Sequence, residues 1–336
     1  MSIKCGVVGA TGYTGLELIK ILLNHPKFDL VYLGSSEGGE NVKTLFKGLD
    51  RVLDMPILKA NPKDIAKVCE VVFLALPHKA SMSFAKELLD FDVRVVDLSA
   101  DYRLKLKNYE EFYTKHIDKE HLKDAVYGLP ELYREKIKNA KLVANPGCYP
   151  TATLLGLIPF LPYIDENYPL FIDAKSGVSG AGKKCTPNTH YVTINENIFA
   201  YNPIKHRHSI EIKEKIEEFT NKEFEINFVP QLIPITRGML VNSYVYLKKD
   251  IDEKEILREF YKDEEFIRIR ENPVDIKSVS GTNFCDIFVM KNNKSLFIST
   301  AIDNLLRGAS SQAVVNANIM FSLPENLGIP KIAYIP

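Results

Sequence analysis

The sequence of 336 residues predicts an α/β protein with two domains, a doubly wound parallel sheet followed by an α+β domain with a largely antiparallel sheet. Up to about residue 147, short runs rich in Val, Ile and Leu alternate with amphipathic stretches. Beyond that point, longer strand-like runs follow one another through turns. The length allows each domain its own core. We therefore expect one domain over 1–147, a second over 148–303, and a C-terminal helix over 304–325 that packs back on the first.

Five short apolar runs are the predicted strands of the first domain, namely residues 3–9, 30–36, 71–77, 93–99 and 141–147. A helix is expected between the first two runs, because apolar residues recur there at helical spacing at Leu16, Ile19, Leu22 and Leu23. Strands that alternate with helices indicate a parallel sheet with crossover connections.

The second domain shows long strand patterns over 224–235 and 240–249, which favour antiparallel pairing. The run over 304–323 is helical in pattern, and its small residues suit close packing against another element. The sequence contains no internal repeat and no low-complexity linker, so the boundary depends only on the change in pattern.

Composition excludes several classes of protein. Lys and Arg number 43 and Asp and Glu 43, so no global field favours nucleic acid or an anionic membrane as partner. The most apolar stretch, 152–164, contains two prolines and is shorter than the roughly 20 residues of a membrane span. The N-terminal residues lead directly into a strand pattern without the regions of a signal peptide, so we expect a cytoplasmic protein.

The cysteines number five, are widely scattered and form no CxxC pair, which argues against a disulfide framework and against a thiolate metal site. No metal is expected. Three of them, Cys5, Cys69 and Cys285, lie in apolar runs and are predicted to be small buried hydrophobes.

A glycine-rich turn, GATGYTG, follows the first predicted strand at residues 9–15. Glycines let the backbone approach a pyrophosphate, and the amides and dipole at the start of the next helix favour an anion. The spacing differs from G-x-G-x-x-G, and a purely structural turn is the alternative. The position between strand and helix favours a Rossmann-type nucleotide site, whose candidate contacts are Gly9, Thr11, Gly12, Tyr13, Thr14 and Gly15.

The second predicted strand ends at Gly34, Ser35 and Ser36, where NAD-selective folds place an acid for the ribose hydroxyls. Serine hydroxyls can instead donate to a 2′-phosphate, which favours NADP(H). Glu37 lies close enough to weaken this inference, and Lys43 is the nearby cation.

The segment GVSGAGKK over 177–184 nearly matches an ATP-binding P-loop. Lys184 stands where that motif needs a hydroxyl for magnesium, and the segment lies in the wrong half of the chain. We interpret it as a turn that shapes a pocket wall, with Lys175 and Lys183 as possible anion contacts.

The candidate nucleophile is Cys148, in NPGCYPT over 145–151. A strand pattern ends just before it, and Pro150 suits the first turn of the apolar helix that follows. A helix N-terminus favours the thiolate over the thiol. The prolines and glycine around Cys148 would hold the sulfur at the carboxyl edge of the parallel sheet, where a cofactor of such a fold lies. A buried, inert cysteine is the alternative.

A thiolate nucleophile needs a partner for proton transfer, and KHRHSIE over 205–211 offers His206 and His208. On a strand the two imidazoles would share a face. A metal clamp is the rival interpretation, but no carboxylate or thiol at ligand spacing completes it. Surface histidines are the third possibility, and we favour acid/base chemistry.

Nine segments resemble the N-acetyl-gamma-glutamyl-phosphate reductases, a family related to the aspartate-semialdehyde dehydrogenases. Beside the glycine turn and NPGCYPT they are FLALPH at 73–78, DLSADYRL at 97–104, YGLPEL at 127–132, KSGVSGAGK at 175–183, HRHSIEI at 206–212, PITRGML at 234–240 and IDNLLRGASSQAV at 302–314. They cover nearly the whole chain in order. Ile210 stands where the family usually has proline.

The resemblance implies an oxidoreductase of arginine biosynthesis that reduces an acyl phosphate to a semialdehyde with NADPH and releases phosphate. Cys148 would attack the carbonyl to form a thioester, which accepts hydride and collapses to the aldehyde. His206 would transfer the proton, with His208 in reserve and Glu211 orienting a histidine.

The remaining site residues also come from the resemblance. Ser99 and Arg103 would bind the departing phosphate, Asn145 would contact the substrate, and Arg207 or Arg237 would hold its carboxylate. Further cofactor contacts would be Pro77, Ser176, Gly177 and Asn304, with Asn304 facing the nicotinamide. The protein would be a homo-oligomer, either a dimer or a tetramer.

Three alternatives stay open. The same chemistry can act on aspartyl phosphate or on an aminoadipyl phosphate of lysine biosynthesis, in some cases presented on a carrier protein. A phosphate-dependent aldehyde dehydrogenase of the glycolytic kind would share Cys and His but use NAD. A non-catalytic NADP-binding regulator would keep the glycine turn and would not need Cys148 and the two histidines together.

Overall fold

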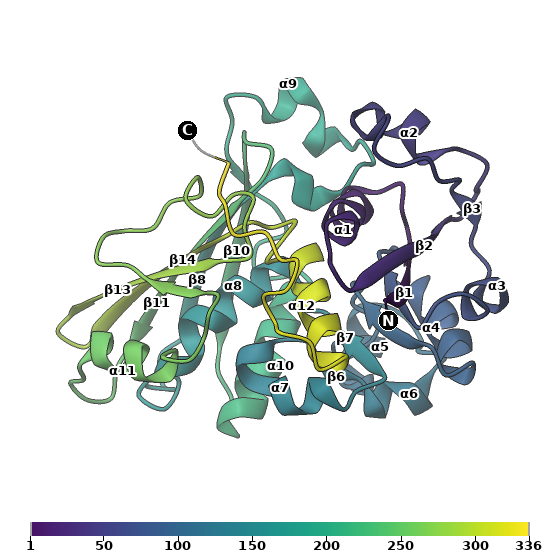
Figure 1. The fold of residues 1–336 in the computed structure, drawn as a ribbon. Coiled ribbons are helices and arrows are strands. Elements are labelled where there is room, and N and C mark those ends of the chain that lie inside the picture. Colours follow the sequence, from purple (N-terminus) through teal and green to yellow (C-terminus); the bar gives the residue numbers. More distant parts are fainter. Residues whose placement is uncertain (1, 335–336) are drawn as a thin grey trace. The chain divides into compact units, whose positions relative to one another are not determined.

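The computed structural model describes residues 2–334 and divides into two compact units. The first unit runs to Pro146 and includes Ala309–Ile329, and the second consists of Gly147–Gly308 with the described residues from Pro330 on. Each unit has its own sheet and its own core (Figure 1).

The sheet of the first unit has seven strands in the order β3-β2-β1-β4-β5-β7-β6, and every pairing is parallel. All five predicted runs contain a strand. The bounds are β1 Ile3–Val8, β2 Phe28–Ser35, β3 Leu58–Lys59, β4 Val71–Leu74, β5 Arg94–Asp97, β6 Val126–Tyr127 and β7 Leu142–Ala144. Only β3 and β6 were not predicted, because two residues are too few to show an apolar pattern.

Helices cross over between these strands. They are α1 Tyr13–Leu23, α2 Val42–Leu45, α3 Pro62–Ala66, α4 Ser81–Asp90, α5 Leu106–Phe112, α6 Lys119–Asp124 and α7 Pro130–Lys138, with a 3-10 turn η1 at Lys47–Leu49. The predicted helix near the C-terminus is α12, Ser310–Met320, which packs on α1, α7 and β5. It begins six residues later than the expected start at 304, because residues 303–308 form a separate turn.

Helix α12 is buried along its whole length, and the side-chain NH2 groups of Gln312 and Asn316 donate hydrogen bonds within the first unit. Asn316 donates to the Gly128 carbonyl at 2.9 Å and to the Asn145 side-chain oxygen at 3.0 Å, and Gln312 donates to Gly128 at 3.2 Å. Buried polar groups with partners specify a single docking position. The helix is therefore fastened beside the end of β7.

The second unit holds a mixed seven-stranded sheet in the order β12-β13-β14-β11-β8-β10-β9. Antiparallel pairs outnumber the parallel pairs β8·β10 and β12·β13. The bounds are β8 Leu170–Gly177, β9 Phe199–Ala200, β10 Ile226–Ile233, β11 Met239–Tyr246, β12 Ile267–Ile269, β13 Cys285–Asn292 and β14 Ser295–Ile302. The two predicted strands are β10 and β11, but they are not neighbours, since β8 lies between them.

One face of this sheet is covered by α8, Cys148–Leu157, which packs on β11, β14 and α10, His208–Thr220. The other helical segments are α9 Tyr191–Ile194 and α11 Glu253–Phe260, with 3-10 turns η2 Ile158–Phe160, η3 Val178–Ala181 and η4 Pro187–Thr189. The opposite face carries exposed aromatic side chains at Phe171 and Tyr244, which pair across β8 and β11.

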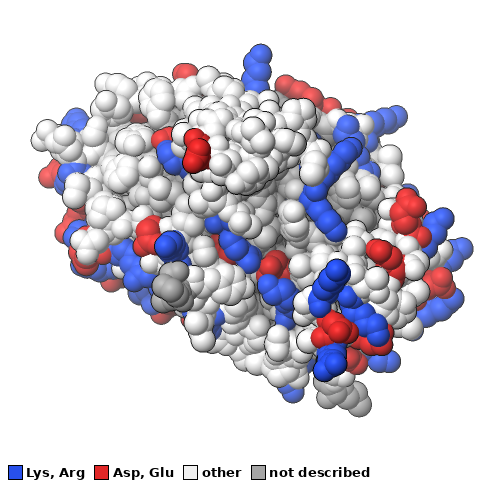
Figure 2. All heavy atoms as spheres, turned by 90° about the horizontal axis from the view of Figure 1, so that it is seen from above, with Lys and Arg blue, Asp and Glu red and all other residues white. Residues whose placement is uncertain are grey.

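Within residues 2–334, none of the helices has the length and apolar character that crossing a membrane requires. Acidic and basic side chains are interspersed on the face shown in Figure 2, in agreement with the equal numbers of the two charges.

Candidate active site

The glycine turn after β1 has the geometry of a phosphate-binding loop. Gly9 has a φ of 92°, and its amide donates to the Gly34 carbonyl at 2.8 Å. A Cβ atom on Gly9 would overlap the Ala75 carbonyl oxygen, and one on Gly15 would overlap the Gly9 carbonyl oxygen. Helix α1 starts at Tyr13, and within the described chain no side chain caps its first turn. The N-terminal amides of α1 are thus arranged as a helix-terminus anion site requires.

The end of β2 presents two serines in different environments. Ser35 is buried, and its hydroxyl oxygen accepts the Gly38 amide at 2.9 Å. Ser36 and Glu37 are exposed. Lys43 forms an ion pair with Asp54. Ser36 is therefore the accessible hydroxyl at this strand end.

The loop after β5 buries both residues predicted to bind phosphate. Ser99 donates to the Asp97 carboxylate at 2.7 Å. Arg103 is 5% exposed and donates to the Asn145 and Leu98 carbonyls, each at 2.7 Å. Arg103 is therefore not a surface side chain. Asn145 is also buried and donates to the Ala309 carbonyl at 3.1 Å.

The loops that follow β4 and β5 are tied together by Asp101, which sequence reasoning passed over. Its buried carboxylate accepts the Lys79 amide at 2.8 Å and the Met82 amide at 3.2 Å. In return, His78 accepts the Ala100 amide at 2.9 Å. Burial and then the negative charge of Asp101 raise the pKa of Asp97 to about 6. Pro77, a predicted cofactor contact, is exposed in the first of these loops.

Cys148 is the first residue of α8, and Gly147 is its N-cap. The sequence prediction of a thiol at a helix N-terminus is confirmed, although the helix starts two residues before Pro150. Cys148 is partly exposed, whereas Cys5, Cys69 and Cys285 are buried, as expected. Burial raises the pKa of the Cys69 thiol to about 12, so that thiol stays protonated. Among the cysteines, Cys148 combines access with a helix-terminal position.

On a strand the two imidazoles would have shared a face, but the structure places the two histidines at the start of a helix. His206 precedes α10, and His208 is its first residue. The ring centroids are 4.9 Å apart, and each ring lies 5.8 Å from the ring of Tyr149, the neighbour of Cys148. The two imidazoles lie close together at the start of α10, where both rings contact the ring of Tyr149.

His206 has a lowered pKa of about 4, first because it is buried and second because the Arg207 cation lies beside it. Its Nδ1 atom accepts the His208 amide at 3.1 Å, so the neutral ring carries its proton on Nε2. His206 is therefore a neutral hydrogen-bond donor near pH 7.

Two tyrosines that sequence reasoning missed complete this cluster. The Tyr201 hydroxyl donates to the Tyr149 hydroxyl at 3.0 Å. Burial is the main cause that raises the pKa of Tyr201, against the opposing effect of its hydrogen bond with Tyr149. No spacing in the sequence indicates this pair of tyrosines.

Glu211, expected to orient a histidine, accepts the Gly147 amide at 2.9 Å and is 1% exposed. Its carboxylate thus holds the residue directly before Cys148. Because Glu211 and His208 share the first turn of α10, one helix start contacts both neighbours of Cys148, Gly147 through Glu211 and Tyr149 through His208.

The remaining candidates of the second unit lie at one edge of its sheet. Ser176 and Gly177 end β8, and both are buried. The Asn304 side chain accepts the Gly238 amide at 2.6 Å and donates to the Ser179 hydroxyl at 3.0 Å. Arg237 forms an ion pair with Asp303 at 2.9 Å, and Arg207 is exposed. Residues 2–334 contain no cluster of three His, Cys, Asp or Glu side chains that could hold a metal ion.

Two family models match the chain. The model described as semialdehyde dehydrogenase, NAD binding domain, covers residues 4–140, and the one described as semialdehyde dehydrogenase, dimerisation domain, covers 148–304. A nucleotide-binding parallel sheet joined to a mixed-sheet domain that starts at a cysteine defines the class, a phosphorylating semialdehyde dehydrogenase. The chain belongs to the semialdehyde dehydrogenase family and, within it, to the N-acetyl-gamma-glutamyl-phosphate reductases.

Similar proteins support this assignment over the full length. The N-acetyl-gamma-glutamyl-phosphate reductase of Sulfurovum sp. is 60% identical, with 99% of this chain and 100% of that protein covered. That of Wolinella succinogenes is 59% identical, with 99% of each covered.

Solved structures show the same fold at lower identity. Aspartate semialdehyde dehydrogenase II from Vibrio cholerae has a TM-score of 0.74 at 17% identity, covering 96% of this chain and 99% of that one. Aspartate semialdehyde dehydrogenase with NADP from Candida albicans has a TM-score of 0.72 at 16% identity, and the match covers 97% of this chain and 100% of that one. The predicted fold class and family are both confirmed.

Proposed function

We propose that this protein reduces N-acetyl-gamma-glutamyl phosphate to N-acetylglutamate 5-semialdehyde with NADPH and releases phosphate, a step of arginine biosynthesis. The observation that carries the proposal is the accessible Cys148 thiol at the start of α8, directly before Tyr149, whose ring contacts the paired imidazoles of His206 and His208. Relatives that carry the name of this activity align over the full length at up to 60% identity.

The first chemical step is acyl transfer to sulfur. The Cys148 thiolate attacks the acyl-phosphate carbonyl, the bond from carbon to the phosphate oxygen breaks, and a thioester forms as phosphate leaves. The dipole at the start of α8 favours the thiolate, and the Glu211 carboxylate holds the preceding Gly147 amide in place. When bound, NADPH supplies the hydride that reduces the thioester carbon.

His206 stabilises the oxyanion of the second step. Its neutral ring, protonated on Nε2, donates a hydrogen bond to the oxygen that becomes negative as the carbonyl carbon turns tetrahedral. The proton stays on Nε2, and the oxyanion re-forms the carbonyl when the carbon–sulfur bond breaks and the aldehyde leaves. Cys148 is then again a thiolate. His208 is the reserve for this role.

The phosphate and carboxylate of the substrate need cationic partners. Arg103 and Ser99 are our candidates for the departing phosphate, because a guanidinium fork matches its oxygens. Arg207 is the exposed candidate for the substrate carboxylate, whereas Arg237 already pairs with Asp303. Asn145 lies beside Arg103, because the Asn145 backbone carbonyl accepts a hydrogen bond from Nε of Arg103.

The chain has an NAD(P)-binding domain, and we assign it to NADP(H). The glycine turn and the uncapped first turn of α1 fit a pyrophosphate, with Thr11 and Thr14 on the same loop. Ser36 would contact the 2′-phosphate, because it is exposed at the end of β2 where an acid would select NAD. Asn304, Ser176 and Gly177 would face the nicotinamide.

The decisive test is an assay in the reverse direction, with phosphate and either NADP or NAD. We expect N-acetylglutamate semialdehyde to react far faster than aspartate semialdehyde or the aminoadipate analogue, and NADP to be used far better than NAD. Cys148→Ser should bind the cofactor normally and lose turnover by roughly 10³-fold or more. Exposed Cys185→Ser is the control and should keep full activity. Near-normal turnover by Cys148→Ser would refute the nucleophile, and equal kcat/KM for the two cofactors would refute the NADP assignment.

The second unit contains the dimerisation domain of the family, and we propose that its open sheet face joins two copies of the chain. Exposed apolar side chains collect there on three strands, β8, β11 and β13, namely Phe171, Tyr244, Tyr246 and Met290. Aromatic side chains and Met are enriched at protein interfaces. The face would be buried in a homo-oligomer.

A further inference from the structure

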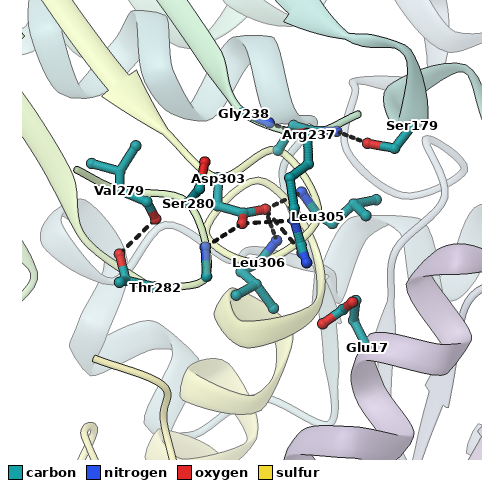
Figure 3. A network of polar contacts seen from close by, with 12 residues as sticks. Glu17, Ser179, Arg237, Gly238, Val279, Ser280, Thr282, Asp303, Leu305 and Leu306 are labelled. Atoms are coloured by element: carbon teal, nitrogen blue, oxygen red, sulfur yellow. Dashed lines mark hydrogen bonds and ion pairs between the residues drawn. The ribbon is translucent and has the colours of Figure 1, made fainter. Parts of the chain in front are cut away.

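Asp303, which directly follows β14, is a fully buried carboxylate with 0% exposure. It accepts the amides of Gly281 at 2.7 Å, Leu305 at 2.9 Å and Leu306 at 3.1 Å. Both of its oxygens also face Arg237, at 2.9 Å from Nε and 3.2 Å from Nη2. Figure 3 shows the Arg237 side chain and the backbone nitrogens of Leu305 and Leu306 directed at this carboxylate. The charge of Asp303 is therefore matched by one guanidinium and three amides.

These contacts join three separate segments at one edge of the second sheet. Ile302 pairs with Met239, the first residue of β11, and with Cys285, the first residue of β13. The loops that lead into both strands thus reach Asp303, one through Arg237 and the other through Gly281. The side chain of the next residue, Asn304, donates a hydrogen bond to the hydroxyl of Ser179, which follows the end of β8. Asn304 therefore connects the same edge of the sheet to a third segment.

The turn that starts at Asp303 ends against the nucleophile. The Gly308 amide donates to the Asp303 carbonyl at 2.9 Å and closes the turn. A Cβ atom on Gly308 would lie 2.6 Å from the Cys148 Cβ and 2.6 Å from the Asn304 carbonyl oxygen. No real Cβ contact is that short, so the backbone of the turn packs directly on Cys148.

We infer that Asp303 is a positioning residue for Cys148, acting through the turn 303–308 with Arg237 as its counter-ion. The inference rests on the proposed function in one respect, that Cys148 is the nucleophile. Removing the charge of Asp303 leaves Arg237 without this partner and loosens the turn, so the sulfur loses its fixed position. A shift of about 1 Å in a reacting atom can cost about 10²-fold in rate.

The test compares Asp303→Asn with a matched control, Asp286→Asn. Asp286 is equally buried, and its oxygens accept from Arg268 at 2.5 Å and from Arg270 at 2.7 Å instead of from the turn. Both variants should lower the Tm. Only Asp303→Asn should lower kcat, by about 10²-fold with little change in KM for the semialdehyde.

A second readout needs no turnover. Iodoacetamide labels accessible thiols, and exposed Cys185 in the same molecule serves as the internal reference. We expect Asp303→Asn to change the ratio of Cys148 to Cys185 labelling and its pH dependence, and Asp286→Asn to leave both as in the wild type. If the wild type reduces none of the substrates, the proposed function fails, and this labelling still tests the positioning role.

Gly308→Ala provides an independent variant if Asp303→Asn does not fold. It keeps the ion pair and forces the turn and Cys148 apart, so the same loss of kcat and the same change in labelling are expected. A wild-type kcat and wild-type labelling in Asp303→Asn would overturn the inference. So would identical changes in Asp286→Asn, since these would reduce the effect to lost stability.

Discussion

At the scale of single residues, the site depends on how burial and charge set protonation states. His206 is kept neutral by burial and by the adjacent Arg207 cation, which disfavours a second positive charge. A neutral imidazole can stabilise an oxyanion by a hydrogen bond donated from Nε2. The pair formed by a helix-terminal thiol and a neutral imidazole therefore suits acyl transfer followed by reduction.

The effect of Arg207 on His206 has a definite sign. Removing the cation in Arg207→Gln removes a repulsion that penalises protonated His206, so the pKa should rise from about 4 toward its usual value of 6.5. Activity that needs the neutral ring would then begin to fall at a higher pH. The acidic limb of the kcat/KM profile, together with NMR titration of His206, measures the shift. Lys205→Gln, an exposed neighbour, is the control. If the acidic limb of the kcat/KM profile does not move in Arg207→Gln, a group other than His206 controls that limb.

At the scale of elements, strand–turn–helix connections place the functional groups of each unit. The turn from β1 to α1 brings backbone amides to a helix start, and the end of β7 leads into α8 with Cys148 as its first residue. Both arrangements use helix N-termini, where amides without intrahelical partners favour negative charge. The buried polar contacts of α12 hold the end of β7 through Asn145.

The glycine turn offers a prediction at this scale. A methyl group in Gly15→Ala would overlap the Gly9 carbonyl oxygen, so the turn must open. We expect the dissociation constant of NADPH to rise at least about tenfold, equivalent to about 1.4 kcal/mol. Quenching of protein fluorescence or calorimetry measures this binding. Gly48→Ala, where a methyl group meets open space, is the control and should bind normally. Labelling of Cys148 should be unchanged in both variants, and unchanged NADPH binding in Gly15→Ala would contradict the phosphate-loop assignment.

At the scale of the whole molecule, the open face of the second sheet is the proposed site of association. A sheet face with exposed aromatic side chains on β8 and β11 is costly to leave in water. The family model that matches the second unit describes a dimerisation domain. Assembly would therefore involve the second unit.

A charge on that face should weaken assembly. Tyr244 is 47% exposed, and Tyr244→Lys places an ammonium group where the second copy would pack. We expect the dissociation constant of the oligomer to rise by roughly 30-fold or more, as for a hot-spot loss of about 2 kcal/mol. Sedimentation equilibrium measures the mass. Phe91→Lys in the first unit, where Phe91 is also 47% exposed, is the matched control. A Tyr244→Lys protein that associates like Phe91→Lys would place the interface elsewhere.

Local features of the site were predictable from the sequence. The apolar runs, the glycine turn and a cysteine between Gly147 and Pro150 are short-range patterns, and short-range sterics and periodicity determine them. The two histidines were also predicted as a pair. The sequence did not specify their secondary structure; α10 begins at His208, and tertiary packing on Tyr149 orients both rings.

The sequence by itself determined the parallel sheet, the nucleotide turn, the thiol at a helix start and the family. Only the tertiary structure decided that β8 separates β10 from β11, that Glu211 binds Gly147, and that the turn 303–308 is held by Asp303 and packs on Cys148. The physical reason is the sequence separation over which each kind of interaction acts. Periodicity and turn chemistry act between near neighbours in the chain, whereas a buried carboxylate finds partners tens of residues away, and no local pattern specifies which ones.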